Sequence, residues 1–123
     1  SSGGRKRGPD DFAGDVEMNI VVFVTAKDSS EAERISRKLL QGKLIACANI
    51  VEGVKSFFWW QGKIDDASEV LLILKSREDL FKKIVKTVQS VHSYEVPEVI
   101  ALPIIEGNPD YLRWIDESLR QSS

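Results

Sequence analysis

The sequence is poor in the residues from which catalytic and metal centres are most often built. Its 123 residues contain one cysteine and one histidine. A single cysteine excludes an intrachain disulfide framework and fits a reducing compartment. The sequence also has no CxxC pair, no phosphate-cradling glycine loop and no nucleophile–base pair. We therefore expect a protein that is not an enzyme.

Long apolar runs and a dominant charge are missing too. The longest apolar stretch, residues 99–105, is interrupted by Pro103 and is far shorter than the roughly 18 residues of a membrane span. A net charge of -2 does not suit a general nucleic-acid binder, which has a clustered basic face. We expect no nucleic-acid partner, no direct membrane insertion and a cytoplasmic location, unless a full-length form carries targeting information that is not visible here.

The first 17 residues are expected to be a disordered tail. Ser1-Ser2-Gly3-Gly4 resembles an expression remnant, and the basic run Arg5-Lys6-Arg7 is followed by acidic residues without any apolar period. The folded part is predicted to cover residues 18–123. A chain of this length has room for one hydrophobic core, so we expect a single domain.

Residues 44–76 predict one long β-hairpin, around which the rest of the chain is organised. The turn is Trp60-Gln61-Gly62-Lys63, where Gly62 supplies the positive φ of a tight two-residue connection. Near the tip, Phe57, Phe58 and Trp59 would project an apolar patch into water. Exposed patches of this kind usually mark protein–protein contacts, so we interpret these three residues as contacts between subunits.

The other elements follow from apolar periodicity and turn chemistry. Residues 19–25 form a short apolar strand. A capping box, Ser30 with Glu33, starts a first helix, and Gly42 stands where a helix end favours positive φ. A second capping box, Ser76 with Asp79, starts another helix.

The last part of the chain has a connector, a strand and a helix. Residues 92–97 form the connector, because Pro97 forces the preceding residue out of the α region. A strongly apolar strand follows at 98–105. Asn108 then serves as an N-cap, with Pro109 at the first position of a final helix.

This order of elements predicts an α+β protein, a ferredoxin-like βαββαβ sandwich with a long β-hairpin and an added C-terminal helix. In such a fold the sheet is antiparallel and both main helices cover one face. The strands are nevertheless apolar on both faces, so the second face needs cover. A second or third copy of the chain is the simplest source of that cover.

Five stretches, in the same order, resemble the CutA family, which is named for divalent-cation tolerance in bacteria and is widespread in eukaryotes. They are LIACANI at 44–50, FWWQGKI at 58–64, SEVLLILK at 68–75, VHSYEVPEVIALP at 91–103 and GNPDYLRW at 107–114. The resemblance covers residues 20 to about 120. It implies a PII-like homotrimer whose hairpins wrap neighbouring subunits, with clefts between them.

The resemblance also implies a role in divalent metal ion (copper) tolerance or binding. Two departures bear on this role. Ser93 stands where the family usually has proline after the histidine, and Val24 occupies the region where some bacterial members place a copper-binding cysteine. We expect no required cofactor, and copper or another divalent cation bound weakly.

Four residues are the candidate metal ligands: His92, Glu95, Glu98 and Cys47. Imidazole and thiolate both suit copper, although a ligand set with one histidine and one cysteine needs carboxylates as well. The alternative for His92 is a locally hydrogen-bonded residue at a helix end. The alternative for Cys47 is a packed small hydrophobe, and no cation is adjacent to it in the sequence.

A ligand cleft is predicted at Tyr94, Trp60 and Lys75, next to the metal candidates. Two further functions are compatible with the sequence. One is a PII-like signalling module whose cleft takes a small anionic metabolite. The other, suggested by the family's description in animals, is an adaptor that anchors or helps to process a membrane protein such as acetylcholinesterase.

Overall fold

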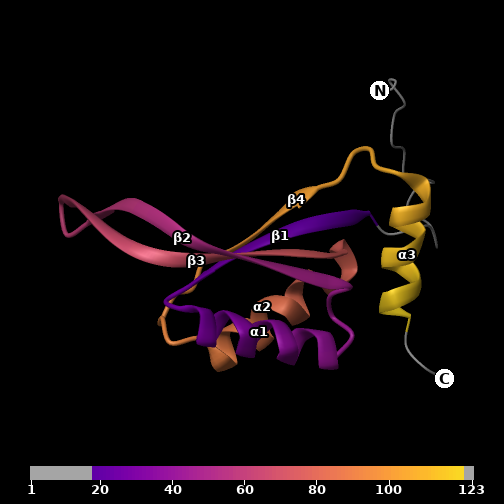
Figure 1. Cartoon of the computed structure of the whole chain (residues 1–123), viewed down its shortest axis with the longest axis horizontal. Helices are drawn as coiled ribbons and strands as arrows, with labels where there is room; N and C mark the ends of the chain where they lie inside the picture. Colours follow the sequence, from indigo (N-terminus) through magenta and orange to yellow (C-terminus); the bar gives the residue numbers. More distant parts are fainter. Residues whose placement is uncertain (1–17, 121–123) are drawn as a thin grey trace.

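The computed structural model describes residues 18–120 (Figure 1). The expected tail at 1–17 lies outside the described residues, as do the last three residues. The elements are β1 (Asn19–Ala26), α1 (Ser29–Gln41), β2 (Cys47–Trp60), β3 (Lys63–Arg77), a 3₁₀ turn at Glu78–Leu80, α2 (Phe81–Val91), β4 (Val99–Pro103) and α3 (Pro109–Leu119).

The four strands form one antiparallel sheet in the order β2-β3-β1-β4. Phe23 of β1 lies opposite Ile73 of β3 on one side and Ile100 of β4 on the other. Figure 1 shows α1 and α2 together on one face of the sheet, and α3 at the end away from the hairpin tip. The predicted ferredoxin-like arrangement with an added C-terminal helix is confirmed.

The core lies between the sheet and the two helices, because alternate strand residues point to the same face. Val22 and Val24 of β1 and Leu72 and Leu74 of β3 are completely buried on this face. The helices contribute further buried apolar side chains: Ala32, Ile35 and Leu39 from α1, and Ile84 and Val88 from α2.

The residues between these core positions form the other face, which we call the open face. It carries apolar side chains from all four strands: Val21, Phe23, Val51, Leu71, Ile73, Ile100 and Leu102. Neither α1 nor α2 covers it (Figure 1), and Ile100 and Leu102 are 50% and 46% exposed. The strands are thus apolar on both faces, as the sequence predicts.

The hairpin of β2 and β3 extends well beyond the helix layer (Figure 1). Gln61 and Gly62 connect the strands, with φ of 50° and 79°. Two positive φ values in a two-residue loop are those of a type I′ turn, whose twist matches that of the flanking strands. At the tip Trp59 is 73% exposed, as expected of an aromatic patch that projects into water.

Helix α1 begins two residues earlier than the sequence pattern suggests. Asp28 is the N-cap, and its carboxylate accepts a hydrogen bond of 2.8 Å from the backbone N–H of Glu31. The capping box assigned to Ser30 is therefore wrong. Gly42 is the C-cap of α1, as expected, but its φ is -85° and the positive φ, 58°, belongs to the following Lys43.

The start of α2 differs too, whereas α3 begins as predicted. Ser76 does not cap a helix, because it lies in β3 and its hydroxyl donates to the carbonyl oxygen of Leu44 at 2.6 Å. Asp79 pairs with Arg77 at 3.0 Å, so the second capping box is wrong. For α3, the side-chain oxygen of Asn108 accepts from the backbone N–H of Asp110 at 2.9 Å, which confirms this N-cap.

Candidate functional site

The predicted strand at 98–105 is shorter in the structure, where β4 covers only Val99–Pro103, so the connector extends over residues 92–98. A groove of about 860 Å³ lies between this connector and the distal half of the hairpin. Both walls come from segments whose residues the sequence singled out. The lining residues are Thr25, Ser56, Phe57, Phe58, Trp60, Asp65, Ala67, Glu69, Tyr94, Glu95, Val96 and Glu98. Residues that the sequence predicts for the site gather in this groove, so it is the candidate functional site.

Strand alternation explains the chemistry of the hairpin wall. Phe58 and Trp60 of β2 share a face, and Phe58 lies opposite Asp65 of β3. Glu69 follows Asp65 by four residues and so points to the same side. The hairpin therefore presents aromatic rings and carboxylates side by side to the groove.

Glu69 ties the connector to the hairpin. One carboxylate oxygen accepts from the Ser56 hydroxyl at 2.6 Å, and the other accepts from the Tyr94 hydroxyl at 2.8 Å. Burial, and then the hydrogen bond to the negatively charged Glu69, raise the pKa of Tyr94 to about 12. Tyr94 is therefore a neutral hydrogen-bond donor at physiological pH, which fixes its ring in the groove wall.

Replacing Glu69 with glutamine is expected to lower the pKa of Tyr94, because the negative charge that opposes phenolate formation is removed. Burial remains, so the pKa stays above its ordinary value of 10. Titration of phenolate absorbance between pH 9 and 13 in a Tyr111→Phe background isolates the Tyr94 signal. Glu98→Gln, in the same groove, is the control. An equal shift of the Tyr94 pKa in both variants would contradict the specific effect of the Glu69–Tyr94 hydrogen bond.

His92 anchors the start of the connector to β1. Its side chain is fully buried. Nε2 lies 2.7 Å from the carbonyl oxygen of Thr25, and Nδ1 accepts from the backbone N–H of Tyr94 at 3.0 Å. A carbonyl can only accept, so Nε2 carries the proton. Both nitrogens are thus occupied, and the geometry gives His92 a positioning role with no lone pair left for a metal.

Glu31, which sequence reasoning missed, completes this anchor. Its carboxylate is completely buried and accepts from the backbone N–H groups of Lys27 at 3.0 Å and Ser93 at 2.8 Å. Oε1 lies 3.9 Å from Nδ1 of His92. The one available signal was local: Asp28-Ser29-Ser30-Glu31 has the spacing of a capping box.

The electrostatics of Glu31 combine two opposing effects. Burial acts to raise the pKa of its carboxyl group, but hydrogen bonds from Lys27 and Ser93, with the nearby His92 ring, act to lower it. The net result is a pKa below the ordinary value of 4.5. Glu31 therefore stays ionised at neutral pH and holds the connector by charge-assisted hydrogen bonds.

Cys47 and Lys75 lie together, away from the groove. They are opposite each other on β2 and β3, with Lys75 Nζ 3.8 Å from Cys47 Sγ and 2.7 Å from the Asn49 side-chain oxygen. Cys47 Sγ is also 3.6 Å from the Tyr111 hydroxyl. The structure thus supplies the cationic neighbour that the local sequence lacks. The hydrogen bond with Cys47, and then burial, raise the pKa of Tyr111.

The structure therefore divides the predicted site residues between two places. Tyr94, Trp60, Glu95 and Glu98 line the groove, whereas His92, Lys75 and Cys47 do not. Within residues 18–120, no group of three or more histidine, cysteine, aspartate or glutamate side chains is placed to hold a metal ion. Of the predicted trimer contacts, Phe57 and Phe58 line the groove and Trp59 does not.

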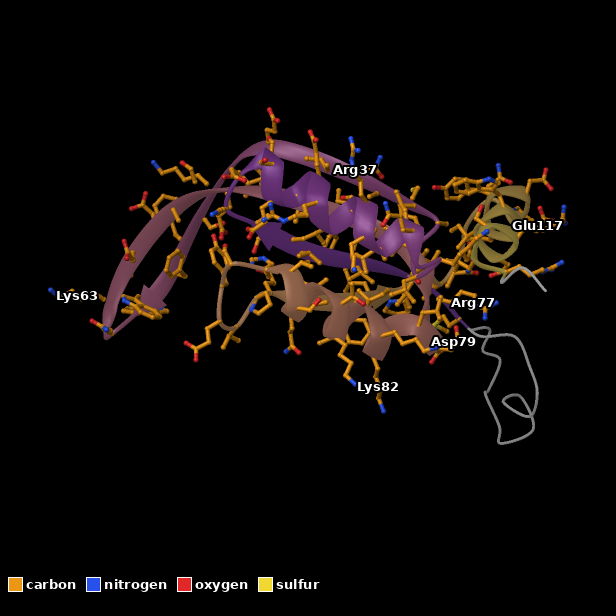
Figure 2. All side chains as sticks on the ribbon, turned by 90° about the horizontal axis from the view of Figure 1, so that it is seen from below. Arg37, Lys63, Arg77, Asp79, Lys82 and Glu117 are labelled. Carbon is orange, nitrogen blue, oxygen red and sulfur yellow. The ribbon has the colours of Figure 1, made fainter. Side chains whose placement is uncertain are left out.

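Figure 2 labels residues at or near both ends of β3. Lys63 marks the hairpin tip, while Arg77 and Asp79 mark the opposite end of β3, close to α3. The groove residues of β3, Asp65 and Glu69, belong to the half of the strand nearer Lys63. Lys75 belongs to the other half, so one bound ion cannot contact both sites within a single chain.

A family model described as CutA1 divalent ion tolerance protein matches residues 20–118. The chain belongs to this family. A relative from Oryza sativa subsp. japonica, "Protein CutA 1, chloroplastic", is 45% identical over 104 residues, covering 85% of this chain and 59% of the relative. The "Divalent-cation tolerance protein CutA" of Archaeoglobus fulgidus is 44% identical over 102 residues, covering 83% of this chain and 99% of the relative.

The fold is also that of a solved CutA1 structure. The crystal structure of CutA1 from Oryza sativa matches with a TM-score of 0.82 and 44% identity, covering 86% of this chain and 97% of that one. The CutA1 names describe divalent-cation tolerance and not a reaction. Among the helices of residues 18–120, none has the length and apolar character to cross a bilayer.

Proposed function

We propose that this CutA1-family chain acts as a non-enzymatic, cytoplasmic homotrimer in divalent metal ion tolerance, and that its groove binds copper or another divalent cation weakly. The observation that carries the proposal is the pairing of an uncovered apolar sheet face with an acidic groove. The open face exposes Ile100 and Leu102. A contiguous apolar surface of this kind is typical of a permanent subunit interface.

The groove supports cation binding over anion binding. Its lining includes four carboxylates, those of Asp65, Glu69, Glu95 and Glu98, and no lysine, arginine or histidine. The negative electrostatic potential of these carboxylates attracts a divalent cation and repels an anionic ligand. Glu95 and Glu98 are the proposed ligands. Weak affinity is expected, because the carboxylates do not converge in groups of three within the described part of the chain.

The roles of His92 and Cys47 in this proposal are changed by the geometry. His92 positions the connector that carries Glu95 and Glu98, since both its ring nitrogens are used. Cys47 stays a candidate ligand for Cu(I) at the separate cluster with Lys75 and Tyr111, because thiolate suits this ion. The cation groove does not require it.

Calorimetric titration with Cu(II), Zn(II) and, under reducing conditions, Cu(I) tests the cation site. The double variant Glu95→Gln/Glu98→Gln is expected to weaken Cu(II) binding about tenfold, because two charged oxygen ligands are lost. The matched control is Glu33→Gln, an exposed carboxylate on α1. Equal isotherms for the double variant and the control would remove the groove carboxylates from metal binding.

Light scattering tests the assembly separately. The proposal expects a mass of three times the subunit's 13.8 kDa, and a folded, soluble monomer at working concentrations would contradict it. The two alternatives stay predictions. The acidic lining does not favour a PII-like module that takes an anionic metabolite, and a pull-down with a Trp59→Ala variant addresses the adaptor role.

A further inference from the structure

The groove carboxylates are spread along its length and not gathered around one point. Asp65 and Glu69 lie on the same side of β3, four residues apart, which corresponds to about 13 Å. Glu95 and Glu98 line the connector wall. Because the described residues hold no cluster of three metal-ligating side chains, a single metal ion would neutralise only part of this charge. An extended ligand with several positive charges fits the distribution better.

The surface between these charges is aromatic. Phe58 lies opposite Asp65, and Trp60 follows on the same face of β2. Ring faces attract ammonium groups and also pack against methylene groups. A hydrated inorganic cation gains little from such a wall. An aliphatic chain with amines at intervals uses both the rings and the carboxylates.

At the inner end of the groove, Glu69 is held in place before any ligand arrives. Its two oxygens accept from Ser56 and Tyr94, and each keeps a second lone pair for a further donor. Preorganisation of this kind lowers the cost of binding. Asp65 at the other end likewise has its side chain fixed, because one oxygen accepts from the backbone N–H of Asp66 at 2.8 Å.

We propose that the groove binds a linear aliphatic polyamine, with one ammonium group near Asp65 beside Phe58 and Trp60, and another near Glu69. Glu95 and Glu98 bind the amines that face the connector. This inference rests on the proposed ligand groove and names the class of organic cation that it takes. Binding requires no covalent step, and the charge of the ligand matches the excess of carboxylates.

The test measures binding of spermidine and 1,8-diaminooctane to the full chain in its native oligomer by calorimetry. n-Octylamine, which has the same carbon chain as the diamine and a single charge, is the matched ligand control. We expect the diamine to bind at least about fivefold more tightly than the monoamine, because only the diamine reaches both ends of the groove. Equal affinities would overturn the proposal.

Three variants locate the ligand. Asp65→Asn and Trp60→Ala are each expected to weaken spermidine binding about fivefold, since one removes a charged contact and the other a ring face. Glu33→Gln on α1 makes the same charge change as Asp65→Asn far from the groove and should leave the affinity unchanged. Equal losses in Asp65→Asn and Glu33→Gln would show non-specific attraction and overturn the proposal. Circular dichroism confirms that each variant is folded.

The outcomes separate this inference from the proposed function. A trimer that binds Cu(II) through Glu95 and Glu98 but binds no spermidine would overturn the polyamine inference alone. Spermidine binding that is lost in Trp60→Ala, in a chain that light scattering shows to be monomeric, would support the inference and contradict the trimer. If a neighbouring copy fills the groove, spermidine will not bind the oligomer, and that result also overturns the inference.

Discussion

Replacing Glu31 with alanine is expected to lower the free energy of unfolding by about 2–5 kcal/mol. The Glu31 carboxylate is completely buried and is the acceptor for two backbone N–H groups, those of Lys27 and Ser93. Without it, these donors lose their partner and a cavity is left at the junction of α1 and the connector. Denaturant unfolding followed by circular dichroism measures the change.

Two related substitutions make the result specific. Glu33→Ala removes a carboxylate from the exposed side of the same helix and is expected to change stability by no more than about 0.5 kcal/mol. Glu31→Gln keeps one acceptor oxygen, so it should lie between wild type and alanine. Hydrogen exchange of the Ser93 and Tyr94 amides should accelerate in Glu31→Ala. Unchanged exchange and stability would show that the connector is held by other contacts.

The pH dependence of this contribution follows from the lowered pKa of Glu31. The folded protein favours the ionised carboxyl group, so the stabilisation is fully present above the ordinary pKa of 4.5 and is lost as the pH falls through the lower pKa of the folded state. The stability difference between wild type and Glu31→Gln should therefore shrink on acidification below that value. A difference that grows on acidification would contradict the assigned direction.

Much of the fold is predictable because local patterns and the fold agree. The apolar runs of β1 and β3, the Gln61-Gly62 turn and the Asn108 cap are each local signals, and each is found where the sequence places it. The misplaced capping boxes show the limit of such signals. Near the start of α1, Asp28-x-x-Glu31 and Ser30-x-x-Glu33 both fit the pattern, and Asp28 is the actual cap. At the start of α2, the contact of Ser76 with Leu44 removes the only predicted cap.

The candidate site is less predictable, because its geometry depends on pairs that are distant in the chain. Glu31 contacts the connector across 62 residues, and Tyr94 contacts Glu69 across 25. Composition and spacing identify Tyr94, Glu95 and Glu98 as polar residues near an apolar assembly. They carry no information on strand register, which places Lys75 beside Cys47 and leaves both outside the groove.

Register also explains why a lone histidine is a weak signal for a metal ligand. His92 ends α2 at the level of Thr25, the residue whose carbonyl oxygen accepts from its ring. That acceptor belongs to β1, far away in the sequence. The choice between a ligand and a structural histidine was thus open from the sequence, and hydrogen bonds to Thr25 and Tyr94 support the structural role.

Leu74→Ala is expected to destabilise the protein by about 2–5 kcal/mol, because it removes a completely buried side chain from the centre of the core. Guanidinium unfolding at several protein concentrations measures this loss. The substitution lies on the helix face of β3, so it should leave subunit number unchanged at low denaturant. A loss below about 1 kcal/mol would show that the core around Leu74 collapses into the space.

Leu102→Ala is the matched substitution on the open face. The loss in the free energy of unfolding that it causes depends on whether another copy of the chain covers that face. In an isolated subunit Leu102 is 46% exposed, so the loss should be about 1 kcal/mol or less. In the proposed trimer the same side chain is buried against a neighbour, and the loss should approach that of Leu74→Ala. The midpoint of unfolding should then rise with protein concentration, because association stabilises the folded chain by mass action. A small loss with a concentration-independent midpoint would mean that the apolar open face lies exposed on a stable monomer.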